Sequence, residues 1–165
     1  MDLFSGEIWG FPFGNKVFDI IFEYIEKGLR IDSILIPSNC SFVYNKDLIK
    51  VIENYIVKFQ RVNTRLAFSI SYDGPYLDKL QRPVLQKSIE KDDSYIDTLF
   101  IFAKKHGFGF HPMIGSHHIE DQIENYKQWM ALMHKHWPNK NEFITTPGWI
   151  MQLETREAGW TDEKI

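Results

Sequence analysis

The chain has 165 residues, of which 44% are hydrophobic, and this is enough for one domain with a substantial core and too few to promise two. Its 19 basic and 22 acidic side chains give a formal charge of −3, so no broad positive field attracts nucleic acid or an anionic membrane. No apolar run approaches the roughly eighteen residues of a membrane span, and the start, Met1 to Glu7, has no basic region followed by a long apolar stretch, so we expect a soluble, cytoplasmic protein. The single cysteine, Cys40, excludes an internal disulfide and any multi-cysteine metal site made by this chain alone.

The first half of the chain alternates short apolar runs with amphipathic stretches. The run Ile34-Leu35-Ile36 is typical of a parallel strand covered on both faces. Gly28 is suited to a left-handed helix C-cap and Asn45 to a helix N-cap. We expect strands over 2–4, 33–37 and 66–71, and helices over 16–28 and 46–59. The apolar helix faces are expected to be Val17, Ile20, Ile21, Tyr24 and Ile25 in the first, and Leu48, Ile49, Ile52, Tyr55, Ile56 and Phe59 in the second.

The second half continues the alternation after a long connection. Residues 75–93 have no clear periodicity, which is typical of a lid or binding loop. We then expect a helix over 94–106, a strand over 108–114, a helix over 119–136 with an apolar face of Ile123, Tyr126, Met130 and Met133, and a strand over 150–156. Such alternation predicts an α/β fold with a parallel sheet. A helix start at Thr161 stops at once, so we expect the chain to be cut in mid-unit at its C-terminus.

Polar residues follow the carboxyl end of each predicted strand, where ligands bind in α/β proteins. These strand-end segments are Ser5-Gly6-Glu7, Pro37-Ser38-Asn39, Ser69 to Gly74, His111-Pro112-Met113 and Glu154-Thr155-Arg156. Ser69 and Ser71 alternate with apolar residues, so both hydroxyls are expected on one face of their strand, as in a barrel interior.

The order of these segments resembles the radical S-adenosylmethionine (radical SAM) superfamily, particularly its peptide- and protein-modifying branch with SPASM-type relatives. Ser5-Gly6-Glu7 is similar to the Gly-Gly-Glu motif after the second barrel strand of that family. Pro37-Ser38-Asn39 resembles the Thr-Asn-Gly turn after the third strand, with Cys40 in the place of glycine. Ser71-Tyr72-Asp73-Gly74-Pro75 matches the Ser-x-Asp-Gly-Pro signature after the fourth strand and is the most specific match.

Two further positions extend the resemblance over nearly the whole chain. Arg82 falls where the family often carries an arginine, although Leu77 replaces a histidine that often stands before Asp78. Leu153-Glu154-Thr155-Arg156-Glu157 is similar to the sixth strand and its turn. The resemblance implies a single domain, 1–165, that forms a partial parallel (β/α) barrel without its first β/α unit and its last helix.

The resemblance also implies an activity. The complete enzyme would reductively cleave S-adenosylmethionine to a deoxyadenosyl radical, which abstracts hydrogen from a peptide or protein substrate. Glu7 would hold the methionyl ammonium of the cofactor. The implied cofactor-binding residues are Ser5, Gly6, Glu7, Ser38, Asn39, Ser69, Ser71, Asp73, Arg82 and Arg156.

The family's Cys-x-x-x-Cys-x-x-Cys motif, which ligates a 4Fe-4S cluster, does not occur in this sequence. Cys40 cannot supply three thiolates, so we expect the isolated chain to be inactive, as a fragment or as a protein that needs a partner with the first strand. A missing first strand leaves an open sheet edge, which predicts self-association. The alternative is a non-catalytic α/β module that binds a partner or a nucleotide-like ligand.

Each candidate residue could also have a purely structural role, without binding a ligand. Glu7 could cap a helix or be solvated, the two serines could bond within a core, and Arg82 and Arg156 could be exposed. The histidine pairs, His117-His118 and His134-x-His136, lack the spacing of zinc helices and are expected at the surface. Trp9, Phe11 and Phe13 are expected to pack rather than to cover an adenine ring. A hydrolase that uses His and Asp lacks a nucleophile elbow here.

Overall fold

The computed structural model describes residues 1, 3, 8–10, 13–77, 94–111, 113–114, 120–139 and 152–153. It divides into two compact units, Met1–Ile70 and Ser71–Ile165. The described parts contain four α-helices and parallel strands, so the predicted α/β class is confirmed. No helix in these described parts is long and apolar enough to cross a membrane.

The first unit alternates strands and helices in chain order. Its elements are η1 (Ile8–Gly10), α1 (Gly14–Glu26), β1 (Ser33–Ser38), η2 (Ser41–Tyr44), α2 (Lys46–Gln60) and β2 (Arg65–Ile70). β1 and β2 are parallel and pair from Ser33 opposite Arg65 to Ser38 opposite Ile70. The predicted helices over 16–28 and 46–59 and the predicted strands over 33–37 and 66–71 are therefore confirmed, with ends that differ by one or two residues. The strand predicted over 2–4 lies partly outside the described residues.

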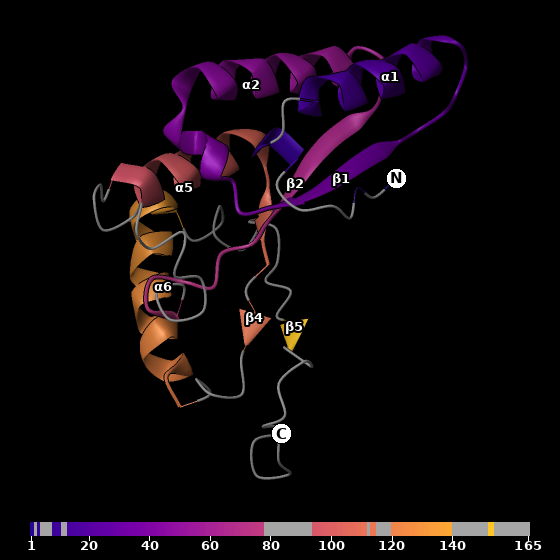
Figure 1. Ribbon diagram of the computed structural model, residues 1–165. Coiled ribbons are helices and arrows are strands. Elements are labelled where there is room, and N and C mark those ends of the chain that lie inside the picture. The colour runs from indigo at the N-terminus through magenta and orange to yellow at the C-terminus, as the bar shows by residue number, and fades with distance from the viewer. Residues whose placement is uncertain are drawn as a thin grey trace. The chain divides into compact units, whose positions relative to one another are not determined.

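The start of the chain pairs with β1 through backbone hydrogen bonds. The Leu3 amide donates to the Leu35 carbonyl at 2.9 Å, and the Leu35 amide donates to the Met1 carbonyl at 2.9 Å. In a parallel ladder, one residue forms hydrogen bonds to two residues of the neighbouring strand that lie two positions apart. The N-terminal segment, β1 and β2 thus lie in the order of the sequence, and Figure 1 shows α1 and α2 on the same side of β1 and β2.

The two faces of this sheet differ in burial. Along β1 and β2 the residues Ile34, Ile36, Leu66 and Phe68 are fully buried, and they alternate with half-buried residues on the other face. The Phe68 ring contacts Phe42 of η2, which leads into α2, so the fully buried face is the one beneath the helices. The expectation of two fully covered faces is thus met on one face only.

The core of the first unit is aromatic. Trp9 is buried and stacks on Phe18 with ring centroids 4.6 Å apart, as its predicted packing role requires, whereas Phe13, which was also expected to pack, is 53% exposed. Phe18 also meets Phe59 edge to face at 6.3 Å. The predicted buried face of α2 is confirmed at Ile52, Ile56 and Phe59.

The predicted apolar face of α1 is partly wrong. Phe18 and Ile21 are buried, whereas Ile20 and Tyr24 are 54% and 56% exposed. α1 carries apolar residues on more than one face, so its periodicity did not specify which face the sheet would cover. The choice of face came from packing against Trp9 and Phe59.

Both predicted helix caps are present. Gly28 has φ +103°, and its amide and that of Leu29 bond back to the carbonyls of Ile25 and Tyr24, which is a Schellman motif. Asn45 Oδ1 accepts hydrogen bonds from the amides of Asp47 and Leu48 at 3.0 and 3.1 Å. These two caps fix where α1 ends and where α2 begins.

The second unit contains α5 (Ser94–His106), β3 (Gly109–Phe110), β4 (Met113–Ile114), α6 (Gln122–His136) and β5 (Gln152–Leu153). The helix over 94–106 is confirmed. The expected strand over 108–114 is instead two short strands, and only 152–153 of the last expected strand is described. β4 and β5 pair in parallel, with Met113 opposite Gln152.

The predicted apolar face of α6 is also partly wrong. Ile123 and Tyr126 are 70% and 53% exposed, whereas Asn125, Trp129 and Met133 are buried. The buried residues are four apart and form one face of the helix. A polar residue on that face is the reason why hydrophobic periodicity selected the wrong one.

Candidate functional site

Five of the ten residues implied as cofactor-binding lie in the described parts. These are Ser38, Asn39, Ser69, Ser71 and Asp73. The other five, Ser5, Gly6, Glu7, Arg82 and Arg156, lie outside the described residues, as do Phe11, His117 and His118.

The parallel register sets where two of the predicted turns begin. β1 ends at Ser38 and β2 ends at Ile70, and these two residues are partners in the ladder. Asn39 and Ser71, the residues that follow, therefore leave the same edge of the pair. This is the carboxyl edge, where the sequence predicts a site.

The turn after β1 is closed by its own side chains. Ser38 Oγ accepts a hydrogen bond from the Cys40 amide at 2.8 Å, and Asn39 Oδ1 accepts one from the Ser41 amide at 2.9 Å. Such bonds to the backbone two residues ahead are the ordinary turn-forming role of serine and asparagine. Ser38 also lies on the helix-covered face, since its register partner there is Ile70.

Cys40 stands where the family pattern has glycine, and it keeps the backbone conformation of a glycine. Its φ is +56° and ψ is 28°, in the left-handed region, and its side chain is fully buried. A residue with a Cβ adopts this conformation at a cost of roughly 1–2 kcal/mol. The turn after β1 therefore contains a left-handed residue that carries a side chain.

Ser69 lies on the opposite face from Ser38. Its register partner is Pro37, on the half-buried face that α1 and α2 do not cover. Its side chain is nonetheless buried. Of the hydroxyls in β1 and β2, Ser69 is thus the one near the carboxyl edge on the face that α1 and α2 do not cover. Ser71 follows β2 and is half-buried.

The turn that contains Asp73 and Gly74 is held by α6. Asn125 Nδ2 donates to the Asp73 carbonyl at 2.8 Å, and Asn125 Oδ1 accepts from the amides of Tyr76 and Leu77 at 3.1 and 3.0 Å. Asp73 is 1% exposed, and Asn125 is also buried. One side-chain amide therefore ties together three backbone groups of this turn.

Gly74 fits this turn because it has no side chain. Its φ is +105°, and a Cβ on it would lie 2.5 Å from Asn125 Oδ1 and closer still to the Trp129 ring. The turn signal Asp-Gly is common, yet here the glycine also makes room for the helix. The structure thus explains the glycine in the most specific motif of the sequence by contact with α6.

Sequence reasoning did not identify Asn125. An asparagine in a helix is ordinarily read as solvated, because it is a weak helix former and is polar. The spacing of Asn125, Trp129 and Met133 was the available signal, since these residues share one face of α6.

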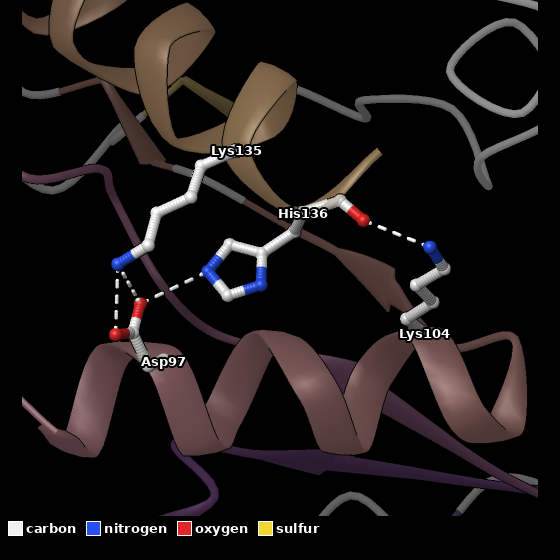
Figure 2. Close-up of polar contacts among 4 residues, drawn as sticks. All are labelled: Asp97, Lys104, Lys135 and His136. Carbon is white, nitrogen blue, oxygen red and sulfur yellow. Dashed lines mark hydrogen bonds and ion pairs between the residues drawn. The ribbon is translucent and has the colours of Figure 1, made fainter. Parts of the chain in front are cut away.

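A second polar cluster joins α5 to α6 (Figure 2). Lys135 Nζ lies 2.7 and 2.8 Å from the two carboxylate oxygens of Asp97, and His136 Nε2 lies 3.0 Å from one of them. Lys104 Nζ donates to the His136 carbonyl at 2.8 Å. The expectation that His136 is a surface residue is wrong, because its side chain is only 9% exposed and contacts the Phe100 ring.

The charges of this cluster follow from its geometry. The hydrogen bonds from Lys135 hold the pKa of Asp97 below its ordinary value. Burial lowers the pKa of His136, although the Asp97 carboxylate opposes that shift. Burial also lowers the pKa of His111, which follows β3. The Asp97 cluster therefore works as a link between two helices.

Among the described residues no three His, Cys, Asp or Glu side chains come together as a metal site. A groove of about 360 Å³ lies at the other end of the first unit, where Thr64 and Asp32 precede the strands. Its walls come from the ends of α1 and α2, so it lies away from the carboxyl edge. The candidate residues therefore lie in the strand-end turns, each described within its own unit. No protein-family model, curated protein or solved structure matches this chain significantly.

Proposed function

We propose that this chain is the S-adenosylmethionine-binding part of a radical SAM enzyme that acts on a peptide or protein. The observation that carries the proposal is the register that starts the Asn39 and Ser71 turns at one sheet edge. Both turns begin with residues that resemble the family's motifs, and the N-terminal segment that leads to Ser5 runs parallel to β1.

The winding of the first unit supports a partial barrel. The N-terminal segment, β1 and β2 are adjacent in sequence order, and α1 and α2 cover one face. Right-handed crossovers in a constant direction place all helices on one side, as in a (β/α) barrel, whereas a doubly wound sheet reverses its order and has helices on both faces. The face without helices, which carries Ser69, would then line the barrel interior.

The side chains at this edge suit the polar groups of S-adenosylmethionine. Hydroxyls such as those of Ser69 and Ser71 can bond to the ribose hydroxyls or to the methionyl carboxylate. The Asp73 carboxylate, which the structure buries, can accept from the ribose hydroxyls or from the ammonium. Ser38 and Asn39 already bond to their own turn through one side-chain oxygen each, so in this proposal they shape the turn.

The iron–sulfur cluster does not fit the cysteine content of this chain. Three thiolates are needed, and Cys40 is the single cysteine, with a buried side chain. In this proposal the chain binds and orients S-adenosylmethionine, and the thiolates come from sequence outside these 165 residues.

Binding is tested by calorimetric titration of the purified chain with S-adenosylmethionine, supported by saturation-transfer NMR, which detects weak ligands. Asp73→Asn and Glu7→Gln should each weaken binding. The matched controls are Asp32→Asn, at the amino end of β1, and Glu26→Gln, at the end of α1, which should bind as the unmodified chain does. An unmodified chain that binds no S-adenosylmethionine by either method would contradict the proposal.

The second candidate is a non-catalytic α/β module that binds a partner or a nucleotide-like ligand. The use of Ser38 Oγ and Asn39 Oδ1 in their own turn favours it, because neither oxygen is set aside for a ligand alone. A module of this kind would bind adenosine as well as S-adenosylmethionine, since the methionyl group would add no contacts. Equal affinity for the two in the same titration would support the module.

A further inference from the structure

We infer that Asn125 is a positioning residue for the site, and that it sets the Asp73-Gly74 turn in the conformation that binds ligand. The inference rests on the proposed function, because it concerns how the same site is built. Its basis is the set of hydrogen bonds from Asn125 to the Asp73 carbonyl and to the amides of Tyr76 and Leu77.

The chemistry of these bonds requires a primary amide. The Asp73 carbonyl needs a donor, and the two amides of Tyr76 and Leu77 need an acceptor. An asparagine side chain supplies both from one planar group, and only one orientation of that group satisfies all three partners. An aspartate would retain the acceptor but would place an oxygen against the Asp73 carbonyl, and a leucine would retain neither.

The burial of this contact makes the turn sensitive to it. Asn125 and Asp73 are both buried, so water cannot replace a lost hydrogen bond without a rearrangement. Gly74 allows the helix to approach closely enough for the contact, since any Cβ there would meet Asn125 and Trp129. The contact of Asn125 with the turn therefore depends on the glycine at position 74.

The contact also determines the position of the Asp73 side chain. Bonds to the carbonyl of Asp73 and to the amides two and three residues beyond Gly74 fix the backbone on both sides of that glycine. A carboxylate that is presented by a fixed backbone binds a ligand without an ordering cost. Asn125 itself is not expected to touch the ligand, so its effect on affinity acts through the turn.

The test compares Asn125→Asp with the unmodified chain in titrations with S-adenosylmethionine. Asn54→Asp is the matched control, because it makes the same chemical change at an exposed position of α2. At pH 8 we expect Asn125→Asp to bind about tenfold more weakly, since the ionised carboxylate cannot donate to the Asp73 carbonyl. Protonation of the new carboxyl restores a donor beside the acceptor, so the affinity of this variant should recover as the pH falls, relative to Asn54→Asp.

Hydrogen exchange supplies a measurement that needs no variant. In the unmodified chain the amides of Tyr76 and Leu77 should exchange slowly, and saturation with S-adenosylmethionine should slow them further, because ligand and Asn125 favour the same turn. The thermal stability of each protein is recorded alongside, so that affinity is compared between folded samples.

The outcomes separate this inference from the proposed function. If the unmodified chain does not bind S-adenosylmethionine, the proposed function is wrong and this inference falls with it. If the unmodified chain binds and a folded Asn125→Asp binds equally well at pH 8, the inference alone is overturned. If Asn125→Asp does not fold, unchanged exchange of Tyr76 and Leu77 on ligand saturation overturns it.

Discussion

The Ser38-Asn39-Cys40 turn is closed by its own side chains, whereas the Asp73-Gly74 turn is held by Asn125, 52 residues further along the chain. Both turns follow parallel strands that end as register partners. The first can form as soon as its own few residues adopt the right backbone. The second needs α6 in place, so one turn is a local element and the other depends on tertiary structure.

This difference affects how each turn responds to mutation. In the first turn a lost side chain leaves one backbone amide without that partner, the buried amide of Cys40 or the partly buried amide of Ser41. In the second turn a lost side chain leaves several buried backbone groups without partners, which costs roughly 1–3 kcal/mol for each group that stays unsatisfied. Mutations in the two turns should therefore differ in size, and four experiments test this comparison.

The largest effect is expected from Gly74→Ala. The new Cβ would be strained at φ +105° and would collide with Asn125 and Trp129, so the free energy of unfolding should fall by about 4 kcal/mol. Gly107→Ala is the control, because Gly107 also has a positive φ, +66°, but has nothing within 4 Å of its Cβ position. Urea denaturation measures both, and equal losses would show that α6 does not constrain the turn.

Asn125→Ala should lower the free energy of unfolding by about 3 kcal/mol, because the Asp73 carbonyl and the Leu77 amide lose a buried partner and the Tyr76 amide loses a partly buried one. The same substitution in the first turn, Asn39→Ala, removes the hydrogen bond to the Ser41 amide and should cost about 1 kcal/mol. Denaturant titration of the two variants gives this difference directly. A larger loss for Asn39→Ala would reverse the comparison.

Substitution of Cys40 tests the strain stored in the first turn. Cys40→Gly should be about 1 kcal/mol more stable than Cys40→Ala, since both lose the buried thiol but only glycine adopts φ +56° without strain. Thermal unfolding of the pair is sufficient. Alanine as stable as glycine at this position would mean that the left-handed turn relaxes in the variant.

The smallest effect is expected from pH. Burial lowers the pKa of His136, so the unfolded chain binds more protons, and stability should fall as the pH drops below the unfolded value of about 6.5. Asp97, whose pKa is lowered chiefly by Lys135, should extend the loss at more acidic pH. As the pH falls, the Tyr76 and Leu77 amides should lose their protection from hydrogen exchange before the Cys40 amide does, because the Asp97 cluster holds α6 against α5. His136→Gln should reduce this dependence, and His134→Gln, at an exposed position, should not.

Much of the first unit could be predicted because its signals are local. Gly28 and Asn45 cap helices through bonds to residues two to five positions away, and these bonds depend little on the rest of the fold. The apolar run of β1 and the polar residues after it likewise identified a strand and its end. The candidate residues Ser38 and Asn39 were found at the expected edge, although one oxygen of each serves the turn itself.

The rest depended on contacts that no local pattern contains. The faces of α1 and α6 were partly mispredicted, since Ile20 and Ile123 are exposed although they fit the helical period. His136 was expected at the surface and lies against Asp97 and Phe100. Each error arose where a helix offered more than one acceptable face and the packing partner made the choice.

The sequence alone determined the alternation of strands and helices, the two helix caps and the places where polar residues follow strands, because backbone preference and short-range hydrogen bonds decide these features. The tertiary structure decided which helix faces are buried, and it placed Asn125 against the Asp73-Gly74 turn. A buried hydrogen bond across 52 residues forms only when the chain has folded and excluded water from both partners. For that reason the residue on which the second turn most depends became visible only in the folded protein.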